Sequence, residues 1–290
     1  MQDSSPKKKI YKAQAQSKQP GLEKKMDPHP DFDHGRHSGK RLEGKICVIT
    51  GGDSGIGRAV AVAFAAEGAE VAIMYMKSEQ KDADATVKYI KTHYGKKCMA
   101  LAVDISKESN CIKAIEKITA TFDQIDVLVN NAAVQYPVKD ITKISDKQLR
   151  ETFEVNIFSM FYLVKAALPF MKEGSNIINT TSVTAYRGSG GLLDYSATKG
   201  AIVSFTRSLS ANLMDKKIRV NGVAPGPVWT PLIPASFDAK EVSTFGSDSP
   251  MGRAAQPHEI ASAYVYLASE DSSFVSGQII HVNGGEIVNG

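Results

Sequence analysis

The sequence predicts an α/β fold: a single domain with a doubly wound parallel sheet of about seven strands, helices on both faces and an extended N-terminal arm. Two observations lead to this prediction. From Lys45 onward, short apolar runs alternate with segments of helical periodicity. Right-handed connections between such strands place helices on both faces of the sheet. The chain has 290 residues, 42% of them hydrophobic, which is enough for one large domain.

The predicted strands are short and apolar along their whole length, because a parallel strand in such a sheet is covered on both sides. In chain order they are Ile46–Thr50, Val71–Tyr75, Cys98–Ile105, Ile125–Val129, Asn176–Thr181, Ile218–Val223 and Gln278–Val282.

The predicted helices are bounded by local start and stop signals. Gly68 and Gly95 end the first two, and Ser145 is placed to cap the fourth. Pro169 limits the last turn of that helix, and Pro257 occupies the first turn of the final one. The helices are Ile56–Glu67, Asp82–Tyr94, Ser109–Phe122, Ser145–Met171, Tyr195–Met214 and Pro257–Ala268.

Residues 1–43 differ in composition from the rest and are predicted to form an extended arm. Residues 1–45 carry a net charge of +5, whereas the remainder is close to neutral. A basic arm can contact nucleic acid or anionic lipid, but no aromatic residues are interleaved with Lys7–Lys9 as in a nucleic-acid platform. We therefore expect a solvated extension, with neither a nucleic-acid nor a membrane partner.

Composition also limits the location and the metal content of the protein. No apolar stretch is expected to span a bilayer, and the N-terminus lacks the apolar segment of a secretion signal. The three cysteines show no metal-like spacing, so we expect free thiols in a reducing, cytoplasmic environment. The histidines are scattered and we predict no metal site; His29, His34 and His37 in the arm are the alternative ligands.

Three residues are spaced for proton transfer. Tyr195 and Lys199 lie four residues apart, so a helix places them on one face, and Ser182 precedes the tyrosine by thirteen residues. A phenol ordinarily titrates near pH 10, and a neighbouring cation favours its ionised form. We therefore expect Lys199 to lower the pKa of Tyr195 toward the working range, while Ser182 holds a carbonyl or alcohol oxygen.

The turn between the first strand and the first helix has the form expected of a dinucleotide-binding site. Thr50–Gly57 reads TGGDSGIG. Its glycines permit a tight turn and close approach to a pyrophosphate, which then faces the helix N-terminus. No Gly-Lys-Ser/Thr follows, which disfavours a nucleoside triphosphate site. The predicted binding residues in this turn are Gly51, Asp53, Ser54, Gly55, Ile56 and Gly57.

Further cofactor contacts are predicted at the ends of later strands. Asp104 can accept from an adenine amino group, or it can cap the turn at Ser106. Asn130 can tie neighbouring strands together, and the small residues that follow permit backbone contact with a ribose. The predicted binding residues here are Asp104, Ile105, Asn131, Ala132 and Ala133.

The choice between NAD and NADP stays open from the sequence. The second strand ends at Tyr75, without the acidic residue that favours NAD, and Tyr75 and Lys77 are predicted cofactor contacts. Lys77 favours a 2′-phosphate, whereas Asp53 disfavours one.

Together these motifs resemble the short-chain dehydrogenase/reductase family over residues 44–285, and this implies a Rossmann-type fold. In the arm, Gln19-Pro-Gly-Leu-Glu and Met26-Asp-Pro-His-Pro are typical of turns that lie along a neighbouring surface. The arm further resembles N-terminally extended bacterial members described as general-stress or glucose/ribitol-dehydrogenase-like. The resemblance implies an NAD(P)-dependent oxidoreductase acting on alcohols, aldehydes, ketones or sugars, assembled as a homotetramer. Ala133 departs from the family, which more often has glycine there.

The resemblance also implies roles for individual residues. Tyr195 corresponds to the general acid of reduction and the base of oxidation, and Lys199 to its partner on the nicotinamide ribose. Ser182, with Thr181 as the alternative, corresponds to the residue that orients the substrate oxygen. Asn156 corresponds to the asparagine that anchors a relay water. The remaining predicted cofactor contacts are Pro225, Gly226, Val228 and Thr230.

Residues 225–256 are predicted to form a substrate lid without clear secondary structure, in which Trp229 either lines the pocket or packs beneath the lid.

Two other functions are considered for the chain: a dinucleotide-binding sensor without catalysis, and a nucleic-acid-binding protein acting through its arm. The presence of all four catalytic residues argues against the first, and the neutral body against the second.

Overall fold

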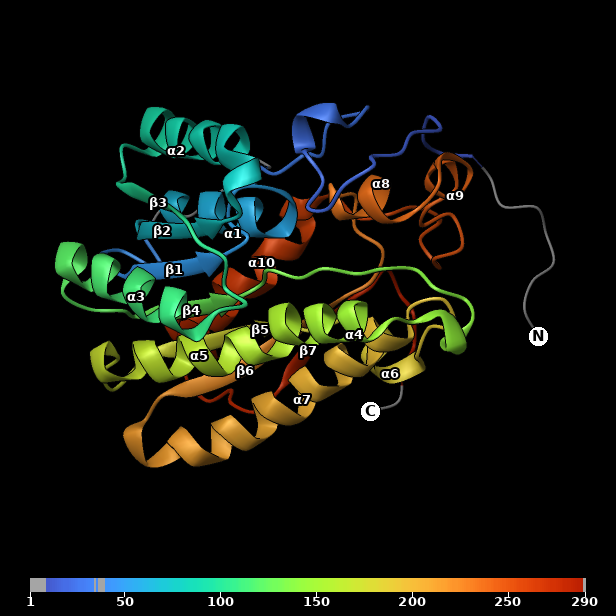
Figure 1. Cartoon of the computed structure of the whole chain (residues 1–290). Helices are drawn as coiled ribbons and strands as arrows, with labels where there is room; N and C mark the ends of the chain where they lie inside the picture. The colour runs from blue at the N-terminus through green and yellow to red at the C-terminus, as the bar shows by residue number, and fades with distance from the viewer. Residues whose placement is uncertain (1–8, 34, 36–39, 289–290) are drawn as a thin grey trace.

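The computed structural model describes residues 9–33, 35 and 40–288. Across these described ranges the chain forms one sheet of seven parallel strands, in the order β3-β2-β1-β4-β5-β6-β7 (Figure 1). The strands are β1 (Ile46–Thr50), β2 (Glu70–Tyr75), β3 (Cys98–Ala102), β4 (Val127–Asn130), β5 (Asn176–Thr180), β6 (Arg219–Pro225) and β7 (Ile279–Val282). The predicted fold class is confirmed.

Helices cover both faces of this sheet (Figure 1). On one side lie α1 (Gly55–Ala66), α2 (Gln80–Tyr94) and α10 (Pro257–Ala268), and on the other α3 (Glu108–Phe122), α4 (Asp146–Phe153), α5 (Ser159–Ala167) and α7 (Leu193–Leu213). Alternation along the strands supplies both cores: Cys47 and Ile49 of β1 face the first set of helices, and Val48 faces the second.

The long helix predicted at Ser145–Met171 forms as a continuous run with an irregular middle. A π-helical turn, η4 (Glu154–Phe158), joins α4 to α5, and a 3-10 turn that contains Pro169 ends the run. By length and composition alone this run, Asp146–Phe170, could cross a membrane, contrary to the sequence prediction. In the fold its α5 part packs on the sheet as part of the second core, which accounts for its apolar character.

Several element boundaries differ from prediction. The third strand ends at Ala102 rather than Ile105, because the Asp104 carboxylate accepts from the backbone and hydroxyl of Ser106 and begins a turn. The lid, predicted to lack regular structure, contains α8 (Leu232–Ser236) and α9 (Ala239–Ser243), and Asp238 caps the second of these. A further short helix, α6 (Thr184–Arg187), follows β5. Short 3-10 turns lie at Glu23–Lys25, Lys77–Glu79, Ile141–Lys143, Leu168–Phe170, Met214–Lys216 and Glu270–Ser272.

The described part of the arm lies along the body of the domain, next to α8 and α9 (Figure 1). The Tyr11 ring stacks on Trp229 with the ring centres 3.8 Å apart. The indole of Trp229 is fully buried and donates to the Pro28 carbonyl at 2.8 Å. Trp229 therefore packs beneath the arm and outside the cavity described below, which resolves the alternative left open for it.

Candidate active site

A cavity of about 1840 Å³ opens at the carboxyl ends of the strands, where open α/β sheets bind their ligands. All the predicted cofactor residues except Gly57 and Lys77 line it, as do Ser182, Tyr195 and Lys199. Lys77 is exposed and outside the cavity lining, so the structure does not bring it into the site. Gly57 lies behind the turn, where a Cβ would come within 1.9 Å of the Gly51 carbonyl oxygen.

The glycine turn fits a closely approaching dinucleotide. Gly51 and Gly55 adopt positive φ angles of 64° and 53°, which L-residues with side chains rarely adopt. A Cβ on Gly55 would lie 3.1 Å from the Thr230 side chain. These glycines place no side chain over the N-terminus of α1, where a phosphate can approach the backbone. The Gly55 N–H itself already donates to the Glu23 carboxylate.

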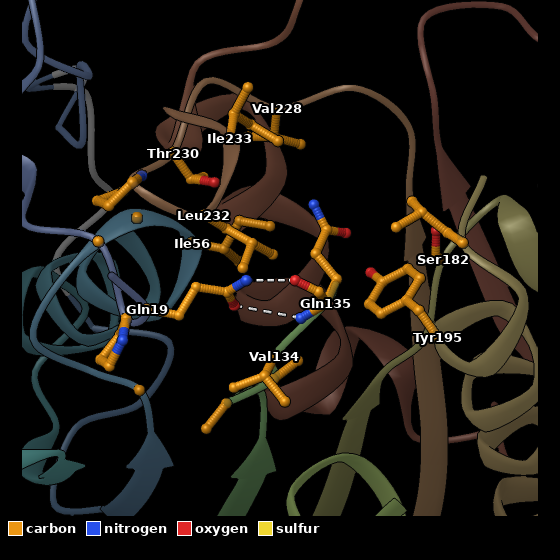
Figure 2. A pocket seen from close by; sticks show the side chains of 18 of the residues that line it. Gln19, Ile56, Val134, Gln135, Ser182, Tyr195, Val228, Thr230, Leu232 and Ile233 are labelled. Carbon is orange, nitrogen blue, oxygen red and sulfur yellow. Dashed lines mark hydrogen bonds between the residues drawn. The ribbon is translucent and has the colours of Figure 1, made fainter. Parts of the chain in front are cut away.

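The proposed proton-transfer residues are assembled by β5 and α7. Ser182 follows β5 and Tyr195 lies in the first turn of α7; both line the cavity, and their side chains lie next to each other at its edge (Figure 2). Lys199, one turn further along α7, is 1% exposed and donates to the Thr180 carbonyl at 2.9 Å. The Thr181 hydroxyl instead donates to the Lys199 carbonyl at 2.8 Å, so it is turned into the helix.

Burial dominates the electrostatics of this group. It raises the pKa of Tyr195 to about 12, and the nearby Ser182 hydroxyl offsets part of that rise. It also lowers the pKa of Lys199 to about 7. The prediction that Lys199 draws the tyrosine pKa down is therefore wrong for this structure. Desolvation of the phenol outweighs the attraction of an amine whose own charge is disfavoured by burial.

Asn156 lies in the π-helical turn, fully buried. Its amide accepts from the Val134 backbone N–H and donates to the Val134 carbonyl, both at 2.9 Å, and also donates to the Thr198 hydroxyl at 3.2 Å. The side chain thus ties the segment after β4 to the π-helical turn and to α7. Because its amide is occupied by protein partners, a relay water at this position would have to bind a backbone oxygen.

Asparagines at the end of β4 hold neighbouring strands together, as predicted. Asn130 donates to the Asn179 side chain at 2.9 Å, and Asn131 donates to the Thr50 carbonyl at 3.1 Å. Asp104 has one carboxylate oxygen engaged with Ser106. Its predicted contact with an adenine would use the other oxygen.

Acidic residues meet at the adenosine end of the cavity. Asp53 is 1% exposed, its Oδ2 atom lacks a hydrogen-bond partner, and burial raises its pKa. Burial and the nearby Asp53 also raise the pKa of Glu79. Since like charges in one buried site cannot both ionise freely, Glu79 keeps its proton near neutrality. Sequence reasoning missed Glu79, because no local motif marks it.

The arm enters the site, which sequence reasoning also missed. Gln19 lines the cavity, and Glu23, 3% exposed, accepts from the Gly55 backbone N–H at 2.7 Å and pairs with Arg58. The sequence signal was the Gln-Pro-Gly-Leu-Glu stretch, which suggests turns lying along a surface but not which surface. Within the described ranges no group of three His, Cys, Asp or Glu side chains is arranged for a metal. His34 and His37, like Lys7 and Lys8, lie outside the described residues.

Comparison with known sequences places this site in a family. Residues 51–286 match the family described as enoyl-(acyl carrier protein) reductase. The chain is 58% identical to the uncharacterized oxidoreductase YhxC of Bacillus subtilis, over 98% of this chain and 99% of that protein. It is 53% identical to a glucose and ribitol dehydrogenase of Daucus carota (97% and 98%) and 51% identical to an NADPH-dependent aldehyde reductase of Arabidopsis thaliana (95% and 98%).

Two solved structures share the fold of this chain, and each contains a nicotinamide dinucleotide. A short-chain dehydrogenase from Burkholderia cenocepacia in complex with NADP is 28% identical, with a TM-score of 0.79 over 85% of this chain and 99% of that one. A 3-ketoacyl-(acyl-carrier-protein) reductase from Brucella melitensis complexed with NADH is 31% identical, with a TM-score of 0.75 over 84% and 98%. The chain therefore belongs to the short-chain dehydrogenase/reductase family of NAD(P)-dependent oxidoreductases.

Proposed function

We propose that this oxidoreductase interconverts small polar aldehydes or ketones and the corresponding alcohols, sugars and polyols included, with Tyr195 as the proton donor and acceptor. The observation that carries the proposal is that Ser182, Tyr195 and Lys199 line the same cavity as the glycine turn. The names of two relatives, a glucose and ribitol dehydrogenase and an aldehyde reductase, support this substrate class.

The raised pKa of Tyr195 suits carbonyl reduction, because the phenol keeps its proton at neutral pH. When bound, the dinucleotide supplies the hydride to the carbonyl carbon in reduction and accepts it in oxidation. Ser182 holds the substrate oxygen, and Tyr195 gives its proton to that oxygen as the C–H bond forms, so that the carbonyl becomes an alcohol. Lys199, when charged, stabilises the phenolate that remains.

Residues on three sides hold the dinucleotide in this proposal. The glycine turn and the N-terminus of α1 receive the diphosphate, Asp104 and Asn131–Ala133 the adenosine half, and Thr230 with its neighbours the nicotinamide half. Through its two hydrogen bonds to Val134, Asn156 orients the segment after β4, which would contact the ribose of the bound dinucleotide.

The substrate end of the cavity is mixed in polarity, which favours small polar substrates. Gln135, Glu151 and Arg187 line it beside Leu192 and Phe237. The direct test is a panel of aldehydes, ketones, alcohols and polyols assayed with both NAD(H) and NADP(H), read by the absorbance of the reduced nicotinamide. We expect turnover on sugars or small aldehydes; turnover confined to large apolar ketones would contradict the proposed substrate class.

We further infer a homotetramer in the cytoplasm. Phe158 and Phe161 on the long α4–α5 run are 44% and 47% exposed, which is unusual for aromatic side chains without a partner surface. The same run pairs between subunits in the family that the sequence resembles. Light scattering of the purified protein tests the assembly, and Phe161→Glu should reduce the measured mass if this face is the interface.

A further inference from the structure

The arm is fastened to the lid before it reaches the cavity. The backbone N–H groups of Ile10 and Tyr11 donate to the Ser243 carbonyl in α9, at 2.8 and 3.1 Å, and that of Gln16 donates to the Pro234 carbonyl in α8. Together with the stacking of Tyr11 on Trp229, these contacts extend along the lid from Trp229 to Ser243. Arm and lid therefore form one packed unit on this side of the cleft.

Gln19 then reaches from the arm into the cavity. Its amide makes a reciprocal pair with the Gln135 backbone, donating to the carbonyl and accepting from the N–H at 3.3 Å. In Figure 2 the side chain extends past Ile56, with Leu232 above it, toward Gln135 and the side of the cavity where Tyr195 lies. One N–H and one lone pair of this amide remain for a ligand.

The next residues close over the glycine turn. Gly21 is buried so tightly against the lid that a Cβ would come within 2.2 Å of the Pro231 carbonyl oxygen. Two residues later the Glu23 carboxylate accepts from the Gly55 N–H and pairs with the buried Arg58 guanidinium. Residues 19–23 thus run from the segment after β4 to the first turn of α1, and both of these segments line the cavity.

From this path we propose that residues 19–23 form a strap across the dinucleotide cleft, in which Gln19 contacts the bound dinucleotide and Glu23 anchors the strap to α1. The inference rests on the proposed dinucleotide site. It assigns Gln19, which lies outside the glycine turn and the Tyr195–Lys199 motif, as a cofactor-binding residue. A dinucleotide held in this way leaves only after the Gln19–Gln135 pair has parted.

Gln14 offers a matched control. It makes the same reciprocal pair with a backbone, accepting from the Asp27 N–H at 3.0 Å and donating to the Asp27 carbonyl, but within the arm and away from the cavity. Gln14→Ala and Gln19→Ala therefore each remove one such pair from the arm, and only the second removes a group that faces the cleft.

The experiment measures dissociation of NADH and NADPH by stopped flow, with nicotinamide fluorescence and an excess of oxidised dinucleotide as trap. We expect Gln19→Ala to release the reduced dinucleotide about three- to tenfold faster than wild type, as the loss of one or two hydrogen bonds predicts. Gln14→Ala should match wild type. Melting temperatures of both variants without dinucleotide should agree, which separates ligand contact from a general loss of arm packing.

Two results would overturn the strap. The first is that the wild-type protein binds and turns over the dinucleotide, but Gln19→Ala releases it at the wild-type rate. The second is that Gln14→Ala accelerates release of the dinucleotide as much as Gln19→Ala does. Failure of the wild-type protein to bind either dinucleotide would instead refute the proposed site, and the strap with it.

Discussion

The amine nitrogen of Lys199 lies 5.3 Å from the centre of the Tyr195 ring, and both residues are almost completely buried on one side of α7. Burial favours the uncharged form of each, because transfer of a charge from water into a low-dielectric interior is costly. The pair therefore begins as a protonated phenol beside an amine that titrates near neutrality. This arrangement favours donation of a proton by Tyr195 over removal of one.

The pH dependence of reduction should report Lys199. Its pKa of about 7 means that the charged fraction of the amine falls as pH rises through neutrality. We expect kcat/KM for carbonyl reduction to fall above about pH 7, because the phenolate formed by proton donation loses its stabilising charge. Lys199→Met should abolish this fall and lower the rate about 100-fold. A wild-type profile that is flat across neutrality would contradict this role.

Arg58 should be important for stability because it is a buried charge held by the arm. It pairs with Glu23 and donates to the Asp82 carbonyl at 2.9 Å. Glu23→Ala leaves the guanidinium without its closest carboxylate, and we expect it to lower the free energy of unfolding by about 3–5 kcal/mol. Lys12→Ala, which breaks an exposed ion pair of the same arm, is the control and should leave urea denaturation unchanged.

Features that depend on residues close together in the sequence were predicted, and contacts between residues far apart in the sequence were not. Alternating strands and helices, the glycine turn and the Tyr195–Lys199 spacing are local patterns, and the structure contains all of them. Glu23 is buried only because Arg58, 35 residues later, is there to pair with it, and no local pattern encodes that contact. The arm was therefore expected to be solvated although it forms part of the site.

The site electrostatics could not be predicted for the same reason. Spacing places Lys199 beside Tyr195, but the size of the desolvation depends on the whole of the surrounding packing. Lys77 was expected in the site but lies outside it. Its position after β2 suggested a cofactor contact, yet the 3-10 turn at Lys77–Glu79 exposes the lysine and buries the glutamate.

Asn156 should matter for stability as well as for catalysis. Removal of its amide leaves the part-buried N–H and carbonyl of Val134 without these partners, so Asn156→Ala should lower the free energy of unfolding by about 1–3 kcal/mol. Thr121→Ala, an exposed position whose hydroxyl contacts only its own helix, should change it by less than about 0.5 kcal/mol. Equal effects in urea denaturation would show that Asn156 does not hold this segment.

Glu79 should make the protein less stable at alkaline pH. Its pKa is raised from 4.5 to about 9, so the folded protein keeps a proton that the unfolded chain releases. The number of bound protons is then larger in the native state between these values, and stability falls as pH rises through this window. Glu79→Gln should raise the free energy of unfolding by about 1–3 kcal/mol near pH 8 and change it little near pH 4. A decrease in stability at both pH values would refute the raised pKa of Glu79.

The most direct test of the central claim is the turnover of Tyr195→Phe, measured with the dinucleotide affinity of the same preparation. The phenylalanine keeps the ring and removes only the hydroxyl that reaches Ser182. We predict a fall in kcat of about 10²–10⁴-fold with the dissociation constant for the dinucleotide unchanged. Turnover within about twofold of wild type would contradict proton transfer by Tyr195.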